Sequence, residues 1–281
     1  MFEQGSPPLA REIAAAKINL ALHGRGKLAD GRHRLETLFA FCLDGDRLEA
    51  SFQAGKGGDP FSLAINGPFA GALDGPNLVE RAWSLMQSRV GVAGDGKTSI
   101  RLIKNLPVAS GIGGGSADAA AALRLMTTLW RVDPAHASAV APQLGADVPA
   151  CLLSLTARGD GAGDELRAVA APEVSGLPIL LVNPRVPLST TVVFAEWDGQ
   201  DRGPLSDDWR AGRNDLEAPA QRLVPAIGEV LAWLRLRPDV TLARMSGSGA
   251  TCFGLFADKA SRDLAAACCP REWWHLATSL R

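Results

Sequence analysis

The 281-residue chain carries 29 basic and 30 acidic side chains, a formal net charge of −1, and 47% of its residues are hydrophobic. This composition is typical of a globular protein, and the length allows one large domain or two modest ones. The near-zero charge provides no broad positive field, so we expect no nucleic-acid partner. No uncharged apolar run reaches the roughly 20 residues that a membrane span needs, and the start shows no signal-peptide pattern. We therefore expect a cytoplasmic protein with no membrane partner.

The five cysteines and four histidines are scattered along the chain and form no C-x-x-C pair. This spacing predicts no structural zinc site, and most of the thiols are expected to be small buried hydrophobes. Tyrosine is absent. No tyrosine can therefore serve as an acid, a base or a stacking group.

Most of the first hundred residues show the alternation that is typical of strands. Apolar residues alternate over residues 46–53 and 61–66, which predicts half-buried strands. Residues 12–24 are apolar enough for a strand, in which Lys17 and Asn19 are polar intrusions. Because residues two apart share a face of a strand, we expect these two side chains to point the same way.

A helical repeat follows over residues 77–90, with Asn77 as a good N-cap residue. Residues 98–106 return to the pattern of a strand. An alanine-rich helix then ends before Pro134, and residues 134–144 predict another short helix.

The second half of the chain begins with a change of composition near residue 160. Residues 157–169 are rich in glycine and charge, which indicates a hairpin or a domain junction. Residues 177–184 predict a buried strand, and the polar residues 198–214 predict a surface loop. Residues 223–236 are helical in pattern, and residues 240–256 read as strand, glycine turn and strand. Strands and helices mix without a regular βαβα rhythm, so we expect an α+β fold in two halves.

The stretch PVASGIGGGSADAAAALRLM, from Pro107 to Met126, places several glycines at the head of the alanine-rich helix. The first turn of a helix has unpaired N–H groups and a partial positive charge, and bare glycines let a polyphosphate approach them. Ser110 and Ser116 add hydroxyl donors, and Ser116 is placed to meet a metal ion bound to the phosphates. The loop is also compatible with a simple chain reversal. It has neither the lysine of a Walker A loop nor the third glycine of a dinucleotide fingerprint.

This stretch resembles the phosphate loop of the GHMP kinase superfamily. Four further segments match, in order, its cytidyl branch, the 4-diphosphocytidyl-2-C-methyl-D-erythritol kinases: AAAKINLALHG, DGRHRLETLFAF, GADVPACL and RMSGSGATCFGLF. The resemblance implies a two-domain α+β fold with an ATP-binding domain over residues 1–160 and a second domain over 161–281. The first would contain a left-handed βαβ element, the second would be ferredoxin-like, and the active site would lie in the cleft between them.

The same resemblance implies ATP-dependent phosphorylation of the 2-hydroxyl of 4-diphosphocytidyl-2-C-methyl-D-erythritol, a step of the non-mevalonate isoprenoid precursor pathway. Asp147 matches the base that takes the proton of this hydroxyl. Lys17 matches the partner that keeps the base ionised and stabilises developing charge. From the residues alone, Lys17 is also compatible with a side chain that snorkels to water, and Asp147 with a turn residue.

By the same resemblance, Asn77 and Lys104 flank the adenine and ribose of ATP. Their simpler interpretations are an N-cap and an exposed strand lysine. Mg²⁺ is expected with ATP, and no carboxylate is dedicated to it, so phosphates and water would hold it. The residues that would hold the ATP phosphates are Pro107, Gly111, Gly113, Gly114, Gly115 and Ser116.

The cytidine end of the predicted site departs from the family pattern Asp-Gly-Tyr-His. Arg32 replaces the tyrosine, and we expect it either to stack on the base or to turn to solvent. His33 remains a candidate for a hydrogen bond to the base edge. Phe194 matches a second aromatic of the pocket or simply packs in the core. Asn19 is expected to contact the sugar alcohol or its diphosphate. A second glycine turn either lies near the substrate or forms a tight hairpin: Gly247, Ser248 and Gly249.

Two other functions remain open at this point. One is a small-molecule kinase of another branch, of the homoserine or mevalonate type, against which the segment DGRHRLETLF argues. The other is a non-catalytic nucleotide-binding sensor, which would be expected to lose the pair Lys17 and Asp147. The expected partners are ATP and a cytidine diphosphate sugar alcohol, and both a monomer and a homodimer are compatible with the sequence.

Overall fold

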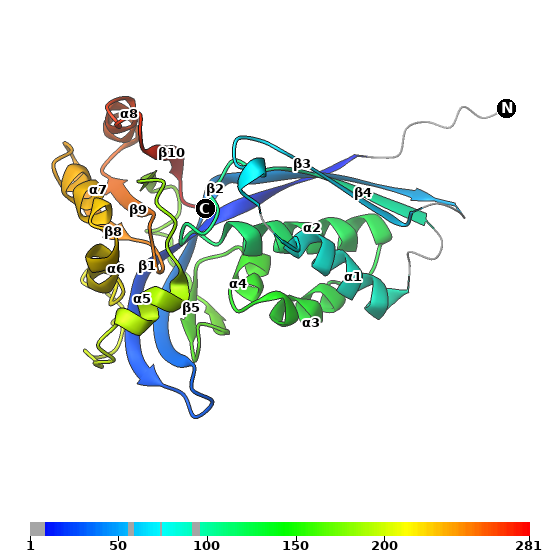
Figure 1. Cartoon of the computed structure of the whole chain (residues 1–281), viewed down its shortest axis with the longest axis horizontal. Helices are drawn as coiled ribbons and strands as arrows, with labels where there is room; N and C mark the ends of the chain where they lie inside the picture. The colour runs from blue at the N-terminus through cyan, green and yellow to red at the C-terminus, as the bar shows by residue number, and fades with distance from the viewer. Residues whose placement is uncertain (1–8, 56–58, 74, 92–95) are drawn as a thin grey trace. The chain divides into compact units, whose positions relative to one another are not determined.

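The structure is a computed structural model that describes residues 9–55, 59–73, 75–91 and 96–281 (Figure 1). The elements in chain order are β1 (Ala10–Lys27), β2 (His33–Ala54), β3 (Phe61–Asn66), the 3-10 helix η1 (Ala70–Ala72), α1 (Leu78–Val90), β4 (Gly96–Ile103), α2 (Gly114–Trp130), α3 (Pro134–Leu144), α4 (Val148–Leu153), β5 (Ala157–Asp160), β6 (Glu165–Ala168), β7 (Pro178–Asn183), α5 (Thr190–Glu196), α6 (Glu217–Leu223), α7 (Ala226–Arg235), β8 (Val240–Met245), β9 (Cys252–Phe256), α8 (Lys259–Ala267) and β10 (Trp274–Ser279).

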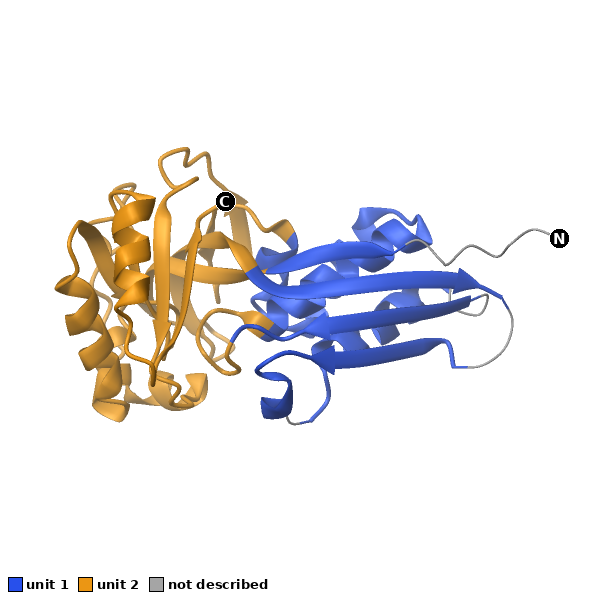
Figure 2. Cartoon of the chain, turned by 90° about the horizontal axis from the view of Figure 1, so that it is seen from above, with its two compact units in different colours: residues 1–14, 45–106, 115–152 blue, residues 15–44, 107–114, 153–281 orange. Residues whose placement is uncertain are grey.

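The chain forms two compact units, each built from separate stretches of sequence (Figure 2). Unit 1 consists of residues 1–14, 45–106 and 115–152, and unit 2 of residues 15–44, 107–114 and 153–281. Strands β1 and β2 each contribute residues to both units. The predicted division into residues 1–160 and 161–281 stays a prediction.

In unit 1, β3 and β4 pair in parallel and α1 connects them, which makes the βαβ element that the resemblance implies. Strand β4 pairs antiparallel with the second half of β2, so that Leu48 lies opposite Leu102. Helices α1, α2 and α3 lie along one face of this sheet (Figure 1). The alanine-rich part of α2 is fully buried, because small side chains let a helix pack closely.

Side-chain caps start two of these helices where the sequence predicts. The Asn77 carboxamide oxygen accepts a hydrogen bond from the Val79 N–H at 2.9 Å, which confirms the predicted N-cap. The Asp133 carboxylate accepts from the Ala135 N–H at 2.8 Å, and Pro134 follows at the first helical position. Asn and Asp are among the best N-caps, and proline is tolerated there because that N–H would have no partner in the helix.

The interior of unit 1 contains a buried ionic cluster of Lys104, Asp46 and Asp118. Lys104 is 1% exposed, and its ammonium donates to both carboxylates, at 2.7 Å in the case of Asp118. Asp46 also accepts hydrogen bonds from the backbone N–H groups of Asn105 and Leu106. The interpretation of Lys104 as an exposed strand lysine is therefore wrong: two carboxylates hold it inside.

The cluster contains two carboxylates and one ammonium, so one bound proton makes its net charge zero. Burial raises the pKa of Asp118 to about 8, against the lowering effect of Lys104 and with a further contribution from Asp46. Burial alone would lower the pKa of Lys104, but both carboxylates together raise it. The Asp118 Oδ1 is buried and has no hydrogen-bond partner among the described residues, whereas Asp46 is stabilised by two backbone donors. The proton therefore resides on Asp118 at neutral pH.

Unit 2 contains an antiparallel sheet in the order β10-β7-β9-β8. The chain order is β7, helices, β8, β9, α8 and β10, which is the ferredoxin-like βαββαβ pattern that the resemblance implies. Helices α6, α7 and α8 lie on one face of the sheet (Figure 1), over a core that includes Leu180, Val230 and Phe256. The first half of β2 pairs with β5, and β5 and β6 form the hairpin that the sequence predicts.

Arg244 on β8 fastens the loop of residues 198–213 to the body of unit 2. This loop has neither helix nor strand, as predicted, but the indole of Trp209 is buried. The buried Arg244 guanidinium donates to the carbonyls of Arg210 and Gly212 in the loop and of Leu20 on β1. One side chain thereby satisfies several backbone acceptors that the loop itself leaves unpaired.

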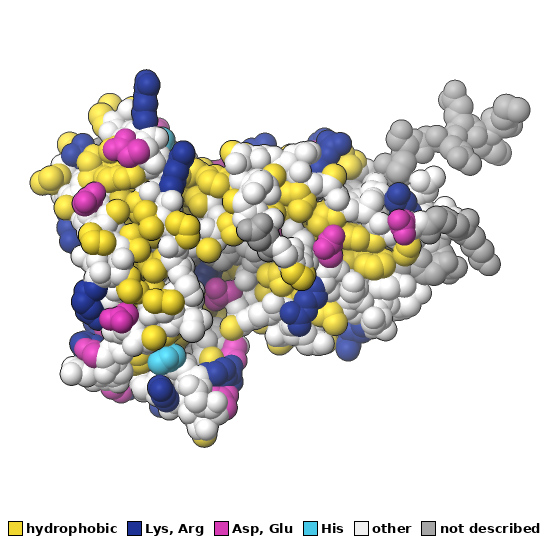
Figure 3. Space-filling view, viewed as in Figure 1, with side chains coloured by type: hydrophobic (Ala, Val, Ile, Leu, Met, Phe, Trp, Pro, Cys, Tyr) yellow, Lys and Arg dark blue, Asp and Glu magenta, His cyan; other side chains and the backbone are white. Residues whose placement is uncertain are grey.

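On the face of the molecule drawn in Figure 3, no large patch of one charge sign stands out. Figure 3 shows acidic and basic side chains interspersed on the face in view, with hydrophobic groups between them. Single exposed leucines, Leu236 after α7 and Leu264 on α8, are of the ordinary kind found on proteins. None of the described helices has the length and apolar character needed to cross a bilayer.

The substitution Asp118→Asn should change how stability depends on pH. Between about pH 4 and pH 8 the folded chain keeps a proton on Asp118 that the unfolded chain has released. This contribution to the free energy of unfolding therefore falls as pH rises, by up to about 1.4 kcal/mol per pH unit. The asparagine variant lacks this fall, so it should gain stability relative to the wild type from about pH 5 to about pH 8 in urea unfolding. Asp133→Asn, which keeps a capping residue, is the control and should follow the wild type. Parallel curves for Asp118→Asn and the wild type would contradict the raised pKa.

Candidate active site

The glycine loop of residues 107–114 leads into α2 and is fixed on two sides by backbone hydrogen bonds. On one side, the Lys17 N–H of β1 donates to the Ile112 carbonyl at 3.0 Å. On the other side, the Thr251 N–H donates to the Ser110 carbonyl at 3.1 Å. The loop is thus held between β1 and the turn that joins β8 to β9.

Two glycines let the loop and that turn approach backbone to backbone. Gly111 has a φ of +76°, and a Cβ there would lie 2.6 Å from the carbonyl oxygens of Gly249 and Ser246. Gly247 has a φ of +57°, and a Cβ there would lie 2.9 Å from the Gly111 carbonyl oxygen. Other residues rarely adopt these angles, and neither position has room for a side chain. The second glycine turn is therefore both a connection between strands and the support of the first loop.

Lys17 and Asn19 point the same way from β1, as their spacing predicts. Lys17 is 4% exposed, and its ammonium donates to the Asn19 carboxamide oxygen at 3.1 Å. The ammonium also lies 5.0 Å from the centre of the Phe39 ring, and Asn19 donates to the Thr37 hydroxyl at 2.8 Å. The snorkelling interpretation of Lys17 is therefore wrong. The side chain is buried in unit 2, and the backbone N–H of the same residue donates the hydrogen bond that anchors the glycine loop.

Ser246 connects these parts, and the sequence analysis missed it. Its hydroxyl accepts from the Asn19 N–H at 3.2 Å and donates to the Gly111 carbonyl at 3.1 Å. Ser248, which the sequence does single out, exchanges a hydrogen bond of 2.8 Å with Thr190 at the start of α5. Ser246 lies beside the glycines in the segment RMSGSGATCFGLF. This position next to the turn is the sequence signal that could have identified it as a site residue.

Several predicted site residues belong to unit 1. Asp147 directly precedes α4, and its carbonyl accepts from the Cys151 N–H at 3.0 Å. Gly115 and Ser116 lie in the first turn of α2. Asn77 caps α1, and its contact with a nucleotide stays a prediction. Because Lys17 lies in unit 2 and Asp147 in unit 1, the predicted contact between them also stays a prediction.

The two aromatic side chains proposed for the cytosine pocket meet in unit 2. The rings of His33 and Phe194 are stacked, with centres 4.5 Å apart and planes inclined by 16°. The Trp197 indole packs edge-on against His33 at 5.5 Å. Burial, and then the positive charge of Lys27, lower the pKa of His33. The imidazole is therefore neutral at neutral pH, with one nitrogen able to donate and the other to accept.

Arg32 takes the second of its two predicted placements. Its guanidinium is exposed and forms ion pairs of 2.8 Å with Asp30 and with Asp164. It joins the turn after β1 to the turn between β5 and β6. A contact between Arg32 and a substrate stays a prediction.

A second phosphate-loop pattern occurs in the chain, outside the glycine-rich stretch before α2. Residues 91–98 read GVAGDGKT, which has the spacing of a Walker A loop, although residues 92–95 lie outside the described part. A Walker A loop follows a strand and opens a helix. Here Gly91 caps the end of α1, and Lys97 and Thr98 lie in β4. The order of elements is the reverse, so this match is accidental.

Comparisons with known proteins were made for the whole chain. Residues 77–154 match the family model of the GHMP kinases N-terminal domain, and residues 204–275 that of the GHMP kinases C-terminal domain. The chain is 51% identical over 284 aligned residues to the 4-diphosphocytidyl-2-C-methyl-D-erythritol kinase of Rhizorhabdus wittichii, covering 96% of this chain and 94% of that one.

Solved structures give the same picture of the fold. A crystal structure of 4-(cytidine 5'-diphospho)-2C-methyl-D-erythritol kinase superposes with a TM-score of 0.82 at 32% identity, covering 96% of this chain and 99% of that one. A homoserine kinase from Cytophaga hutchinsonii superposes with a TM-score of 0.70 at 16% identity, covering 100% and 97%. The second likeness concerns the fold alone.

The substitution Gly111→Ala should weaken nucleotide binding by disturbing the loop. The new Cβ would meet two carbonyl oxygens at 2.6 Å in a left-handed backbone conformation, so the loop must move. We expect at least a tenfold weaker affinity for ADP by calorimetry and a lower melting temperature, because such strain costs on the order of 1–3 kcal/mol. Gly115→Ala is the structural control. Its Cβ would meet only Leu78 at 3.7 Å within a helix, so its melting temperature should not fall. An unchanged melting temperature and ADP affinity in Gly111→Ala would contradict the role of the close approach.

Proposed function

The chain belongs to the 4-diphosphocytidyl-2-C-methyl-D-erythritol kinase family of the GHMP kinases, and we infer from this that it phosphorylates the 2-hydroxyl of 4-diphosphocytidyl-2-C-methyl-D-erythritol with ATP. The reaction is a step of the non-mevalonate route to isoprenoid precursors. One structural observation supports it most directly. The N–H of the buried Lys17 binds the Ile112 carbonyl at 3.0 Å, so one residue supplies an ammonium group and anchors the glycine loop.

We propose that Asp147 is the general base and Lys17 its cationic partner. The 2-hydroxyl oxygen attacks the γ-phosphorus of ATP, the bond to the β,γ-bridging oxygen breaks, and the hydroxyl proton passes to the Asp147 carboxylate. A positive charge near the reacting oxygen stabilises the charge that develops on it. The hydrogen bond from Lys17 to Asn19 and the contact with Phe39 hold that ammonium in one orientation. Such positioning is most of what phosphoryl transfer requires of a protein.

The glycine loop and the first turn of α2 would hold the phosphates of ATP. Unpaired N–H groups at a helix start favour anions, and Ser116 adds a hydroxyl there. Mg²⁺ fits here as an ion carried by the nucleotide, because the Ser116 hydroxyl in the first turn of α2 is an oxygen ligand of the kind that this ion prefers. Ser116 would be its protein ligand beside phosphates and water, and the ion would neutralise phosphate charge.

The neutral His33 and the ring of Phe194 are proposed to recognise the cytosine. A neutral imidazole can donate to and accept from a base edge, and an aromatic face suits stacking on a flat ring. In the present arrangement the two rings stack on each other, so a base would bind beside the pair or separate it. Arg32 leaves the region open to solvent, because Asp30 and Asp164 hold its guanidinium.

A kinase for homoserine or mevalonate and a non-catalytic sensor are the alternative functions. Overall fold does not separate these enzymes, because one fold hosts different chemistries. The segment with His33, and its stack on Phe194, favours a substrate with a flat base. The retained and buried Lys17 favours an enzyme over a sensor.

Asp147→Asn should abolish turnover and leave nucleotide binding intact. The amide cannot accept the hydroxyl proton, so kcat should fall by a factor of about 100 or more, while the Kd for ADP stays within about twofold. Asp133→Asn, which changes the cap of α3 in the same unit, is the matched control and should retain activity. Turnover by Asp147→Asn at the wild-type rate would show that another group is the base.

The substrate itself is tested by ADP release from ATP and Mg²⁺ with 4-diphosphocytidyl-2-C-methyl-D-erythritol, homoserine and mevalonate in parallel. We expect turnover with the cytidyl substrate alone. Phosphorylation of homoserine or mevalonate instead would keep the glycine loop as a nucleotide site and overturn the substrate. Binding of ATP without turnover of any alcohol would favour the sensor.

A further inference from the structure

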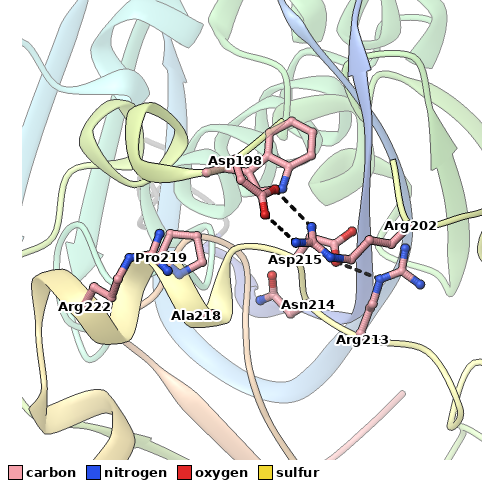
Figure 4. Close-up of a pocket in the computed structure, with 9 residues that line it drawn as sticks. Asp198, Arg202, Arg213, Asn214, Asp215, Ala218, Pro219 and Arg222 are labelled. Atoms are coloured by element: carbon pink, nitrogen blue, oxygen red, sulfur yellow. Dashed lines mark hydrogen bonds and ion pairs between the residues drawn. The ribbon is translucent and has the colours of Figure 1, made fainter. Parts of the chain in front are cut away.

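A cavity of about 270 Å³ lies in unit 2 (Figure 4). None of the residues predicted for the active site lines it, although its Trp197 packs against His33 and its Asn214 donates to the Gly247 carbonyl. Its wall combines Trp197 after α5, the loop that follows, the chain segment before α6, and α6 itself. Three arginines face two aspartates around it: Arg202, Arg213 and Arg222 against Asp198 and Asp215. Arginine remains charged in proteins, so the lining carries one positive charge more than negative.

Both carboxylates of the cavity are already occupied. Asp198 accepts from Arg202 and from the Gln200 N–H, and Asp215 accepts from Arg213 at 2.7 Å and from the Gly24 N–H at 2.8 Å. Figure 4 shows the two ion pairs as dashed lines. Each carboxylate oxygen therefore has a donor. The acceptors of the lining are satisfied by the protein itself.

The cavity lining has more hydrogen-bond donors than its own carboxylates use. Arg222 donates to the Glu196 carbonyl at 2.8 Å and forms no ion pair within the described part of the chain. A guanidinium has five N–H donors, so most of those on Arg222 are left for another partner. The hydrogen bond from Arg202 is the largest cause of the lowered pKa of Asp198. The positive charge of Arg222 is a smaller cause of the same lowering, so it acts on a group of the cavity lining.

The Trp197 indole forms a tightly packed part of the cavity wall. It is 7% exposed, and its Nε1–H is buried with no partner among the residues described. Its neighbouring ring atoms pack so closely on Gly24 that a Cβ there would lie 2.2 Å from the ring. Gly24 is the residue whose N–H binds Asp215. A buried polar group without a partner costs on the order of 1–3 kcal/mol.

We propose that this cavity is a binding site for a small phosphate-type oxyanion, held by Arg222 and Arg213. A ligand with only acceptors complements a lining whose unused groups are donors, and guanidinium groups bind oxyanions in a fork geometry. The volume admits a phosphate group with attached water or a short organic tail, and is small for a nucleotide. The site does not depend on the proposed function, because binding can be measured without turnover.

The test uses the full chain with its glycine loop saturated by ADP and Mg²⁺, so that the nucleotide site is filled. Inorganic phosphate and glycerol 3-phosphate are titrated separately by calorimetry. Binding of both probes would indicate that the cavity takes a phosphate group with a tail, and binding of inorganic phosphate alone would indicate the free ion. The proposal is overturned if neither probe binds.

Variants locate the bound anion. Arg222→Gln removes the exposed guanidinium and should weaken binding about tenfold or more, since a charge-assisted hydrogen bond is lost. Arg101→Gln removes another exposed guanidinium, on β4, and should leave the affinity unchanged. Equal affinities in the two variants would place the anion elsewhere and overturn the proposal.

The indole N–H gives a readout at the site itself. One of the seven tryptophan indole resonances in a ¹H–¹⁵N spectrum is assigned to Trp197 by its disappearance in Trp197→Phe. That resonance should change its chemical shift as either bound probe is added, because the Trp197 ring lines the cavity. The other six resonances report that Trp197→Phe is folded. An unmoved Trp197 resonance at saturating phosphate would also overturn the proposal.

Discussion

Three stretches of backbone meet at the glycine loop, and the candidate site depends on that meeting. The loop needs β1 on one side and the turn before β9 on the other, and it has no space for a side chain at Gly111. The Ser246 hydroxyl closes the junction by joining the Asn19 N–H to the Gly111 carbonyl. Residues far apart in the sequence therefore constrain one another's positions through direct backbone contact. Glycine, which costs chain entropy in any loop, is required here by contact as well as by dihedral angle.

Local signals in the sequence predict the elements that have local causes. The helix after Asn77 and the helix from Pro134 start at the predicted residues, because a capping side chain or a proline acts on its immediate neighbours. The hairpin of β5 and β6 follows from its glycines in the same way. The short helices α4, α5 and α6 were not predicted, since packing in the folded chain rather than a repeat of apolar residues sustains helices of one or two turns.

The candidate site shows where sequence reasoning alone reaches its limit. The spacing of Lys17 and Asn19 predicts a shared face, but their burial depends on Phe39 and Thr37 from another strand. Lys104 looked like an exposed strand residue because the two carboxylates that enclose it are distant in sequence. The glycine-rich loop suggested a phosphate site, whereas the Walker A spacing at residues 91–98 misleads until the order of its elements is known. Pairings between distant residues are what the sequence pattern does not contain.

The division of the chain into two interleaved units has a consequence for synthesis on the ribosome. All segments of unit 1 have been made once residue 152 is added, so this unit can form its sheet and helices early. Residues 15–44 of unit 2 are made before unit 1 is complete, and although β1 and β2 pair with each other, most of unit 2 begins only at residue 153. During that interval the nascent chain exposes the hydrophobic first half of β2 and much of β1. The same residues that later anchor the glycine loop are thus, for a time, a natural client for a chaperone that binds extended apolar segments.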